Sequence, residues 1–309
     1  MPEPRSIENV CEVRALSGPG TAREAPPDLL IEVPHGATKR RHYEAVRARL
    51  ASRLPEGLES FFFVNTDVGA PECAEEVARR LVESDAMRAL KVLIVRSLVP
   101  RTFIDCNRVP IPGVEPQARE GLTPLLPGYI SETADIDLLR QLFDDYLQVV
   151  LEAYERTLGN GGLGLILHSC APRSIRVDAI DGEIVKTMRR AYAPGVYERW
   201  PERPQVEIIG ETEDGDSLAP PSLVDALHRR YAGIGIEVAE NVSYRLDSSS
   251  MGWVHSARYP QRVLCMELNR ALLADPFSPF EEMRIDPGKV RRLSGPIAEA
   301  CEEWFGRPR

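Results

Sequence analysis

Short apolar runs alternate along the chain with longer segments whose apolar residues recur every three or four positions. A near-continuous apolar run bounded by turn residues is typical of a buried strand, and recurrence at helical spacing is typical of a helix with one buried face. The apolar runs predict strands at residues 28–35, 60–67, 90–99, 161–169, 206–211, 235–240 and 262–268. The helical spacing predicts helices at residues 71–84, 135–159, 221–233 and 287–305.

The helix predicted over residues 135–159 has the clearest pattern. One stripe of its surface is apolar, and Gly159 is suited to end it. The residues of that stripe are Ile136, Leu139, Leu142, Phe143, Tyr146, Val149, Val150 and Ala153.

Strands that alternate with helices and are apolar along their length indicate an α/β fold. The sheet is then mostly parallel and covered by helices on both faces. Residues 11–28 are rich in Pro, Gly and Ala, so residues 1–28 are interpreted as a loose lead-in. No composition shift divides the remainder, which predicts a single α/β domain over residues 29–309.

Composition narrows the class of protein. The chain has 43% hydrophobic and 28% charged residues and contains no apolar run long enough to span a membrane. Because it also has no apolar secretory signal near the N-terminus, we expect it to be cytoplasmic. Its six cysteines are scattered without a CxxC pair, which predicts reduced thiols and no cysteine zinc site. A net charge of −9 argues against nucleic acid as a partner. An anionic substrate would then need a local arginine cluster.

Three polar residues stand where predicted strands end: His35, Asp67 and His168. Folds of this class place their sites at the carboxyl ends of parallel strands. Two imidazoles and a carboxylate form a common catalytic zinc set. A single histidine at a strand end is more often structural, but three such residues favour a metal site as much as a structural role.

Two further segments carry charged residues suited to chemistry. Residues 100–108, PRTFIDCNR, contain Arg101, Asp105, Asn107 and Arg108, and arginine can bind a carboxylate with two hydrogen bonds. The alternative is an ion-paired loop in which Arg108 pairs with Asp105. Glu267 lies inside the apolar run VLCMELNR, and a buried carboxylate is normally paired, protonated or catalytic.

For Glu267 the structural alternative is a salt bridge to Arg270 or another arginine. The functional interpretation is a general base that faces a metal site, as in many hydrolases. Position alone does not decide between them.

Seven short blocks, taken in order, carry a family resemblance. They are VPHGA, NTDVGAPECAEEVARRL, PRTFIDCNR, LILHS, RPQVEIIGETEDG, AENVSYR and VLCMELNR. Their order and content over about residues 29–275 resemble the N-formylglutamate amidohydrolase family. The resemblance implies a zinc-dependent amide hydrolase on a fold similar to zinc carboxypeptidases, with a mixed, mostly parallel sheet.

The resemblance also implies residue roles. His35 and His168 would be metal ligands, Glu267 the general base, and Asn107 with Arg108 the pair that binds a substrate carboxylate. Zinc carboxypeptidases take their acidic ligand three residues after the first histidine, where this chain has Thr38. Asp67 is therefore preferred as the third ligand.

Glu72 is the alternative acidic ligand.

The family block NxPYxGG is replaced here by NVSYRLD, which keeps Asn241 and Tyr244 and loses the proline and both glycines. Both kept residues are assigned to substrate binding, and the change leaves the substrate open. Arg101 is expected to bind carboxylate or stabilise the oxyanion.

The expected function is hydrolysis of a small anionic N-acylated amino acid, with N-formyl-L-glutamate as the type substrate and one Zn²⁺ per chain. We expect no nucleic-acid or membrane partner, and a monomer or small homo-oligomer. The alternatives are a zinc peptidase or amidase for a larger substrate and a non-catalytic carboxylate-binding relative. The insertion at 109–130 could act as a lid or platform, and His255 could reach the pocket.

Overall fold

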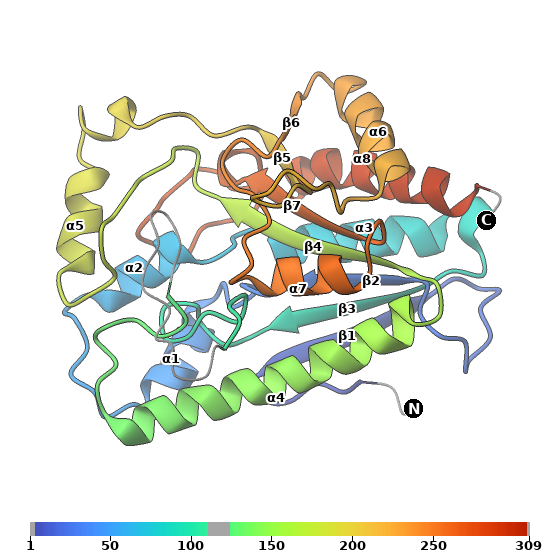
Figure 1. Cartoon of the computed structure of the whole chain (residues 1–309). Helices are drawn as coiled ribbons and strands as arrows, with labels where there is room; N and C mark the ends of the chain where they lie inside the picture. The colour runs from blue at the N-terminus through green and yellow to red at the C-terminus, as the bar shows by residue number, and fades with distance from the viewer. Residues whose placement is uncertain (1–3, 111–123, 308–309) are drawn as a thin grey trace.

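The computed structural model describes residues 4–110 and 124–307 (Figure 1). Its strands are β1 (Cys11–Ser17), β2 (Leu29–Val33), β3 (Lys91–Ser97), β4 (Leu163–Cys170), β5 (Val206–Ile209), β6 (Val238–Glu240) and β7 (Val263–Asn269). Its α-helices are α1 (Arg40–Arg47), α2 (Leu58–Asn65), α3 (Ala70–Glu83), α4 (Thr133–Leu158), α5 (Ile184–Ala191), α6 (Pro221–Ala232), α7 (Met251–Arg258) and α8 (Pro287–Phe305). Short 3₁₀ turns cover Asp85–Met87, Tyr197–Arg199 and Arg270–Leu272.

The strands form one seven-stranded sheet in the order β1-β3-β2-β4-β7-β5-β6. Neighbours β3, β2, β4 and β7 run parallel, as do β5 and β6, whereas β1 pairs antiparallel with β3 and β5 pairs antiparallel with β7. The sheet is mixed and mostly parallel, which confirms the predicted fold class.

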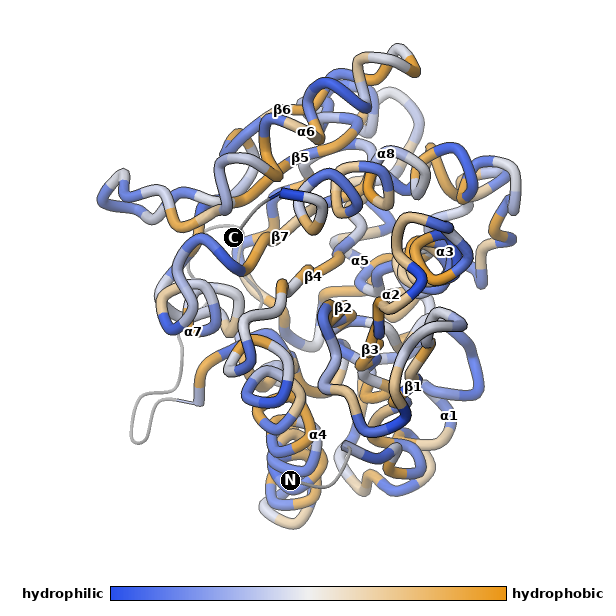
Figure 2. The backbone as a smooth tube through the Cα atoms, turned by 90° about the vertical axis from the view of Figure 1, so that its right-hand side faces the viewer, coloured by the Kyte–Doolittle hydropathy of each residue, from blue (hydrophilic) through white to orange (hydrophobic). Residues whose placement is uncertain are grey.

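Helices cover both faces of the sheet. Figure 2 shows α4 and α7 on one side of the row of strands and α3 and α8 on the other. Strand β2 illustrates why, because Leu30 faces the core beneath α4 while Leu29 and Ile31 face the core beneath α3 and α8. Alternate residues of a strand point to opposite faces, so a strand buried on both sides is apolar throughout.

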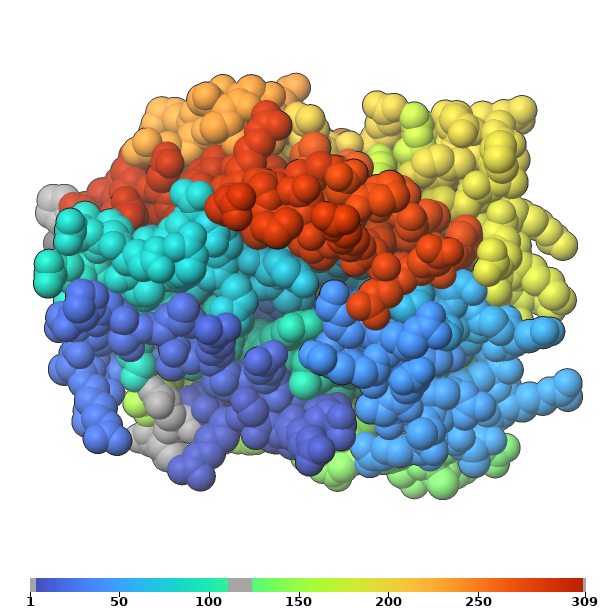
Figure 3. Space-filling view, turned by 180° about the vertical axis from the view of Figure 1, so that it is seen from behind, coloured from blue at the N-terminus to red at the C-terminus, as the bar shows by residue number. Residues whose placement is uncertain are grey.

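The second face is closed by packing between α3 and α8. Figure 3 shows the C-terminal segment, drawn red, against the residues of α3, drawn cyan. Among the described residues, none of the helices is both long enough and apolar enough to cross a bilayer.

Two sequence-based predictions of local structure are wrong. The segment 60–67, predicted as a strand, lies mostly in α2, where Phe61, Phe62 and Phe63 are all buried. A short apolar run does not distinguish a strand from a helix that is buried on most sides.

The loose lead-in predicted over residues 1–28 contains β1, an edge strand whose residues are mostly exposed or half-exposed. Because an edge strand buries little, its sequence lacks a continuous apolar run. The sequence pattern also does not predict helices α1, α5 and α7.

Candidate metal site

Three buried side chains converge beyond the carboxyl ends of β2 and β4. His35 follows β2, His168 lies near the end of β4, and Asp67 lies in the turn between α2 and α3. One candidate ligand atom from each lies within 4.8 Å of the others, and all three residues are buried. The structure thus brings together the three residues that the sequence singles out, although Asp67 follows a helix and not a strand.

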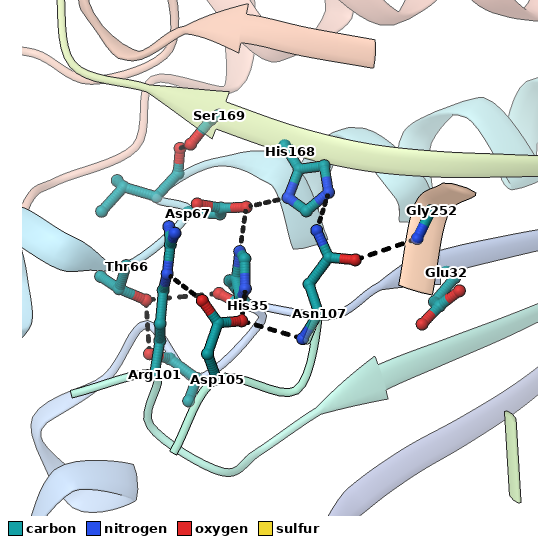
Figure 4. Close-up of polar contacts among 12 residues, drawn as sticks. Glu32, His35, Thr66, Asp67, Arg101, Asp105, Asn107, His168, Ser169 and Gly252 are labelled. Carbon is teal, nitrogen blue, oxygen red and sulfur yellow. Dashed lines mark hydrogen bonds and ion pairs between the residues drawn. The ribbon is translucent and has the colours of Figure 1, made fainter. Parts of the chain in front are cut away.

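Both imidazoles turn the same nitrogen toward Asp67 (Figure 4). The Nδ1 atom of His168 is 2.8 Å from Oδ2 of Asp67, and the Nδ1 atom of His35 is 3.3 Å from the same oxygen. The buried Nδ1 atom of His35 makes no hydrogen bond. Two imidazole nitrogens and a carboxylate oxygen that converge in this way form a donor set suited to a divalent metal.

The other ring nitrogen of each histidine, Nε2, lies next to a different side chain. The Nε2 atom of His35 is 2.7 Å from Oδ1 of Asp105, and the side-chain amide of Asn107 is 3.4 Å from Nε2 of His168. A carboxylate on Nε2 fixes the proton there and leaves the Nδ1 lone pair free for a metal, an arrangement usual around metal-binding histidines. The residues present therefore fit a divalent metal.

Asp67 and Asp105 are held as carboxylates by the polar side chains around them. Burial alone would raise the pKa of Asp67, but the adjacent imidazoles of His35 and His168 lower it below its ordinary value. Burial likewise opposes ionisation of Asp105, and the guanidinium of Arg101, whose Nε donates to Asp105 at 2.9 Å, lowers the pKa of that carboxyl. Metal ligands and their partners need this ionised state.

Arg270 fixes the backbone around the site. Its guanidinium donates to the carbonyl oxygens of Val64 and Ser169 and lies 3.5 Å from Oδ1 of Asp67. These contacts hold the end of α2, the end of β4 and the Asp67 turn at one position.

Glu267 lies beside His168 because the two residues are paired in the register of β4 and β7. Its buried Oε2 atom has no hydrogen-bond partner, and burial raises the pKa of this carboxyl above its ordinary value. Within the described part of the chain it has no ion pair within 4.0 Å, and Arg270, the partner considered for it, binds elsewhere. An unsatisfied carboxylate beside a candidate metal site is typical of a group that acts on a ligand.

A hollow with two lobes surrounds these residues. The larger one, here called the wide lobe, has a volume of about 140 Å³, and the smaller one, the narrow lobe, about 80 Å³. Arg101, Tyr244 and Glu267 line both lobes, so the lobes meet at the candidate site. Asn107 and Arg108 line the narrow lobe only.

Asn241 is not placed with the other predicted substrate-binding residues and lines neither lobe. Its Oδ1 accepts the backbone N–H groups of Gly210 and Glu211. Glu207, buried in β5, accepts backbone N–H groups from Val242 and Ser243. These bonds hold the loop that carries Tyr244 into both lobes.

Sequence reasoning missed the roles of Asp105, Glu207 and Arg203. Arg203 lines the wide lobe, with its guanidinium 5.0 Å from the centre of the Tyr244 ring. It lay in the quoted block RPQVEIIGETEDG, but no pattern separated it from surface arginines. The sequence suggests Asp105 only as a possible partner of Arg108, whereas its side chain binds His35 and Arg101.

The remaining candidates lie apart from the cluster. Glu72 is not part of the His35–Asp67–His168 group. His255 is buried against Tyr154, with the ring centres 3.7 Å apart, and lines neither lobe. Most of the insertion at 109–130, residues 111–123, lies outside the described residues.

Comparison with known proteins supports the fold. No protein-family model and no curated protein matches the sequence. An N-formylglutamate amidohydrolase structure from Ralstonia eutropha JMP134 aligns over 94% of this chain and 97% of its own, with a TM-score of 0.55 and 16% identity. A gene product of Agrobacterium tumefaciens aligns over 95% and 94%, with a TM-score of 0.53 and 15% identity. The fold that the motif blocks predicted is confirmed: the chain has the fold of these two structures.

Proposed function

We propose that the protein is a zinc-dependent hydrolase that cleaves the amide bond of a small N-acylated amino acid. The observation that carries this proposal is the unpartnered Oε2 of Glu267 beside the convergent His35, Asp67 and His168. The name of the Ralstonia structure makes N-formyl-L-glutamate the first substrate to test. Its products would be formate and L-glutamate.

His35, Asp67 and His168 would hold the metal. A divalent zinc ion there would supply Lewis acidity toward a carbonyl group and toward water. Glu267 accepts the proton of the attacking water and returns it to the leaving amine. For this role, a carboxylate whose pKa is raised by burial is a stronger base than an exposed one.

Arg101 and Arg108 have different roles in the proposed reaction. Arg101, which lines both lobes, is placed to stabilise the oxyanion that forms from the carbonyl oxygen. Arg108 and Asn107 bind the substrate carboxylate in the narrow lobe, with Tyr244 closing the site between the lobes. Arg108 is only 5% exposed, so a carboxylate bound there loses little attraction to solvent screening.

Glu267→Gln tests the proposal. The change is nearly isosteric, so folding and zinc content should persist while kcat falls by roughly 10²–10⁴-fold. Glu32→Gln is the control, because Glu32 is also a buried strand glutamate but lines neither lobe. Near wild-type turnover by zinc-loaded Glu267→Gln would remove Glu267 from the mechanism.

The same preparations separate the other candidate functions. A wild type that binds zinc and N-acyl amino acids without cleaving them would be a carboxylate-binding protein. Cleavage of peptides in preference to N-acyl amino acids would indicate a peptidase.

A further inference from the structure

The wide lobe is lined by four arginines, and three of them bind groups of the protein itself. The four are Arg101, Arg173, Arg203 and Arg270. Arg101 donates to the carboxylate of Asp105, and Arg270 donates to backbone carbonyl oxygens. Arg173 is paired with Glu202 at 2.6 Å. The guanidinium groups of these three residues are therefore engaged in holding the site and its surroundings.

Arg203 differs from the other three. Its Nε atom is buried and makes no hydrogen bond, and among the residues that the structure describes no carboxylate lies within 4.0 Å of its guanidinium. Its neighbours are the ring of Tyr244, whose centre is 5.0 Å away, and the thiol of Cys170. Arginine keeps its charge in proteins, and a charge withdrawn from water without an anionic partner is costly. An anionic group bound in the wide lobe would supply that partner.

A second hydrogen-bond donor in the same lobe also lacks a partner. The side-chain amide nitrogen of Asn65, the last residue of α2, is buried and makes no hydrogen bond. Buried polar groups are normally hydrogen-bonded, so Arg203 and Asn65 both call for an acceptor from a ligand. A carboxylate accepts hydrogen bonds at both oxygens and carries the charge that is complementary to arginine.

The remaining surface of the lobe suits a short chain that carries such a carboxylate. Apolar side chains of α2, of α5 and of the connection between β4 and α5 line it, at the end of the molecule where Figure 1 shows α2 and α5 together. They include Phe61, Val64, Ile175, Val177, Ile180 and Met188. The volume of about 140 Å³ has room for about four or five water molecules at roughly 30 Å³ each. A formyl group would leave most of this space to water.

The two lobes give the direction of the substrate. On the proposed function, the carboxylate of the amino acid binds Arg108 in the narrow lobe. The scissile amide then lies where the lobes meet, at Arg101 and Glu267. The acyl part, on the other side of that bond, extends into the wide lobe that Arg203 lines. The substrate therefore has an anionic group on each side of the scissile bond.

We infer that the wide lobe binds an acyl group that ends in a carboxylate, and that Arg203 is the residue that selects this group. Addition of one water molecule across the amide of such a substrate would release a dicarboxylic acid and a free amino acid. The inference rests on the proposed function for the direction in which the substrate lies. It goes beyond that function in naming the acyl class and the residue that recognises it.

The first experiment measures binding without turnover. Zinc-loaded wild type is titrated calorimetrically with succinate and with succinamate. Succinamate is the matched control, because it replaces one carboxylate of succinate by an uncharged amide of nearly the same size. Succinate should bind about tenfold more tightly or better, since a hydrogen-bonded charge is gained. Equal affinity for the two compounds would overturn the inference.

The second experiment locates the second carboxylate of succinate. Arg203→Gln should abolish the preference for succinate while the affinity for succinamate stays within about threefold. Arg173→Gln is the control, because Arg173 lines the same lobe but is paired with Glu202, and it should keep the preference. If folded Arg203→Gln keeps the preference, or if Arg108→Gln removes it instead, succinate does not use Arg203 and the inference is overturned.

Turnover distinguishes the inference from the proposed function. N-succinyl-L-glutamate should have a higher kcat/KM than N-formyl-L-glutamate, and Arg203→Gln should lower only the former, by about tenfold or more. If N-formyl-L-glutamate is cleaved at least as fast and Arg203→Gln affects both substrates equally, the acyl inference fails and the proposed function stands. If neither is cleaved while the preference for succinate still depends on Arg203, the carboxylate site stands and the proposed function fails.

Discussion

Asp105→Asn is expected to weaken metal binding although Asp105 is not a ligand in the candidate set. The Asp105 carboxylate is fully buried and lies 2.7 Å from Nε2 of His35. An ionised carboxylate can only accept a hydrogen bond, so it keeps the proton of His35 on Nε2. An amide can offer either an acceptor or a donor, and a donor would favour the tautomer that protonates Nδ1.

The magnitude follows from this contact. Loss of a partner of this kind typically costs 10–100-fold in metal affinity. That range corresponds to about 1.4–2.7 kcal/mol of binding free energy at about 1.4 kcal/mol per factor of ten. We expect a loss of zinc affinity in the upper half of this range, because the contact between Asp105 and His35 is short and charge-assisted. The change to Asn also removes a carboxylate charge that attracts the cation.

The assay is a zinc titration of metal-free protein against a competing chelator, which gives the Kd of each variant. Asp135→Asn is the matched control, because Asp135 is also a buried aspartate but accepts backbone N–H groups of Ala51 and Ser52, remote from the metal site. The control should lose stability without loss of zinc affinity. A Kd for folded Asp105→Asn within about threefold of wild type would refute the argument that Asp105 orients His35.

Three further outcomes are expected. Asp67→Asn should weaken zinc retention during dialysis against chelator, since a neutral amide is a poorer ligand, and normal retention would remove Asp67 from the ligand set. Tyr146→Phe should lower the free energy of unfolding by about 1–3 kcal/mol in urea titrations, because the Tyr146 hydroxyl donates to buried Glu32 at 2.8 Å; no loss would mean that Glu32 finds another partner. Burial and the nearby Arg258 lower the pKa of His255 to about 3, so the unfolded chain binds a proton that the folded chain does not between that value and about 6.5. Wild type should therefore lose about 2 kcal/mol more than His255→Phe between pH 7 and pH 5, and parallel pH profiles of the two proteins would contradict this assignment.

Local pattern was enough to predict most of the sheet. Strands β2, β3, β4 and β7 are buried on both faces, so each appears as an apolar run whatever its neighbours are. Helix α4 was recognisable because one of its sides packs on the sheet while the other faces solvent. Segment 60–67 was misassigned because α2 is apolar on most of its surface, which removes the periodicity that identifies a helix.

The amino-acid sequence by itself determined which side chains could form the candidate site, because His35, His168 and Glu267 stand in or next to apolar strands whose ends meet at one edge of a parallel sheet. Only the tertiary structure decided how they are used. The nitrogen that each imidazole turns toward Asp67 depends on Asp105 and Asn107, which come from a loop between other elements. The size of the two lobes depends likewise on α2, α5 and the loop that Glu207 holds. Contacts between residues far apart in the chain set these features, and local hydrophobic pattern contains no information about them.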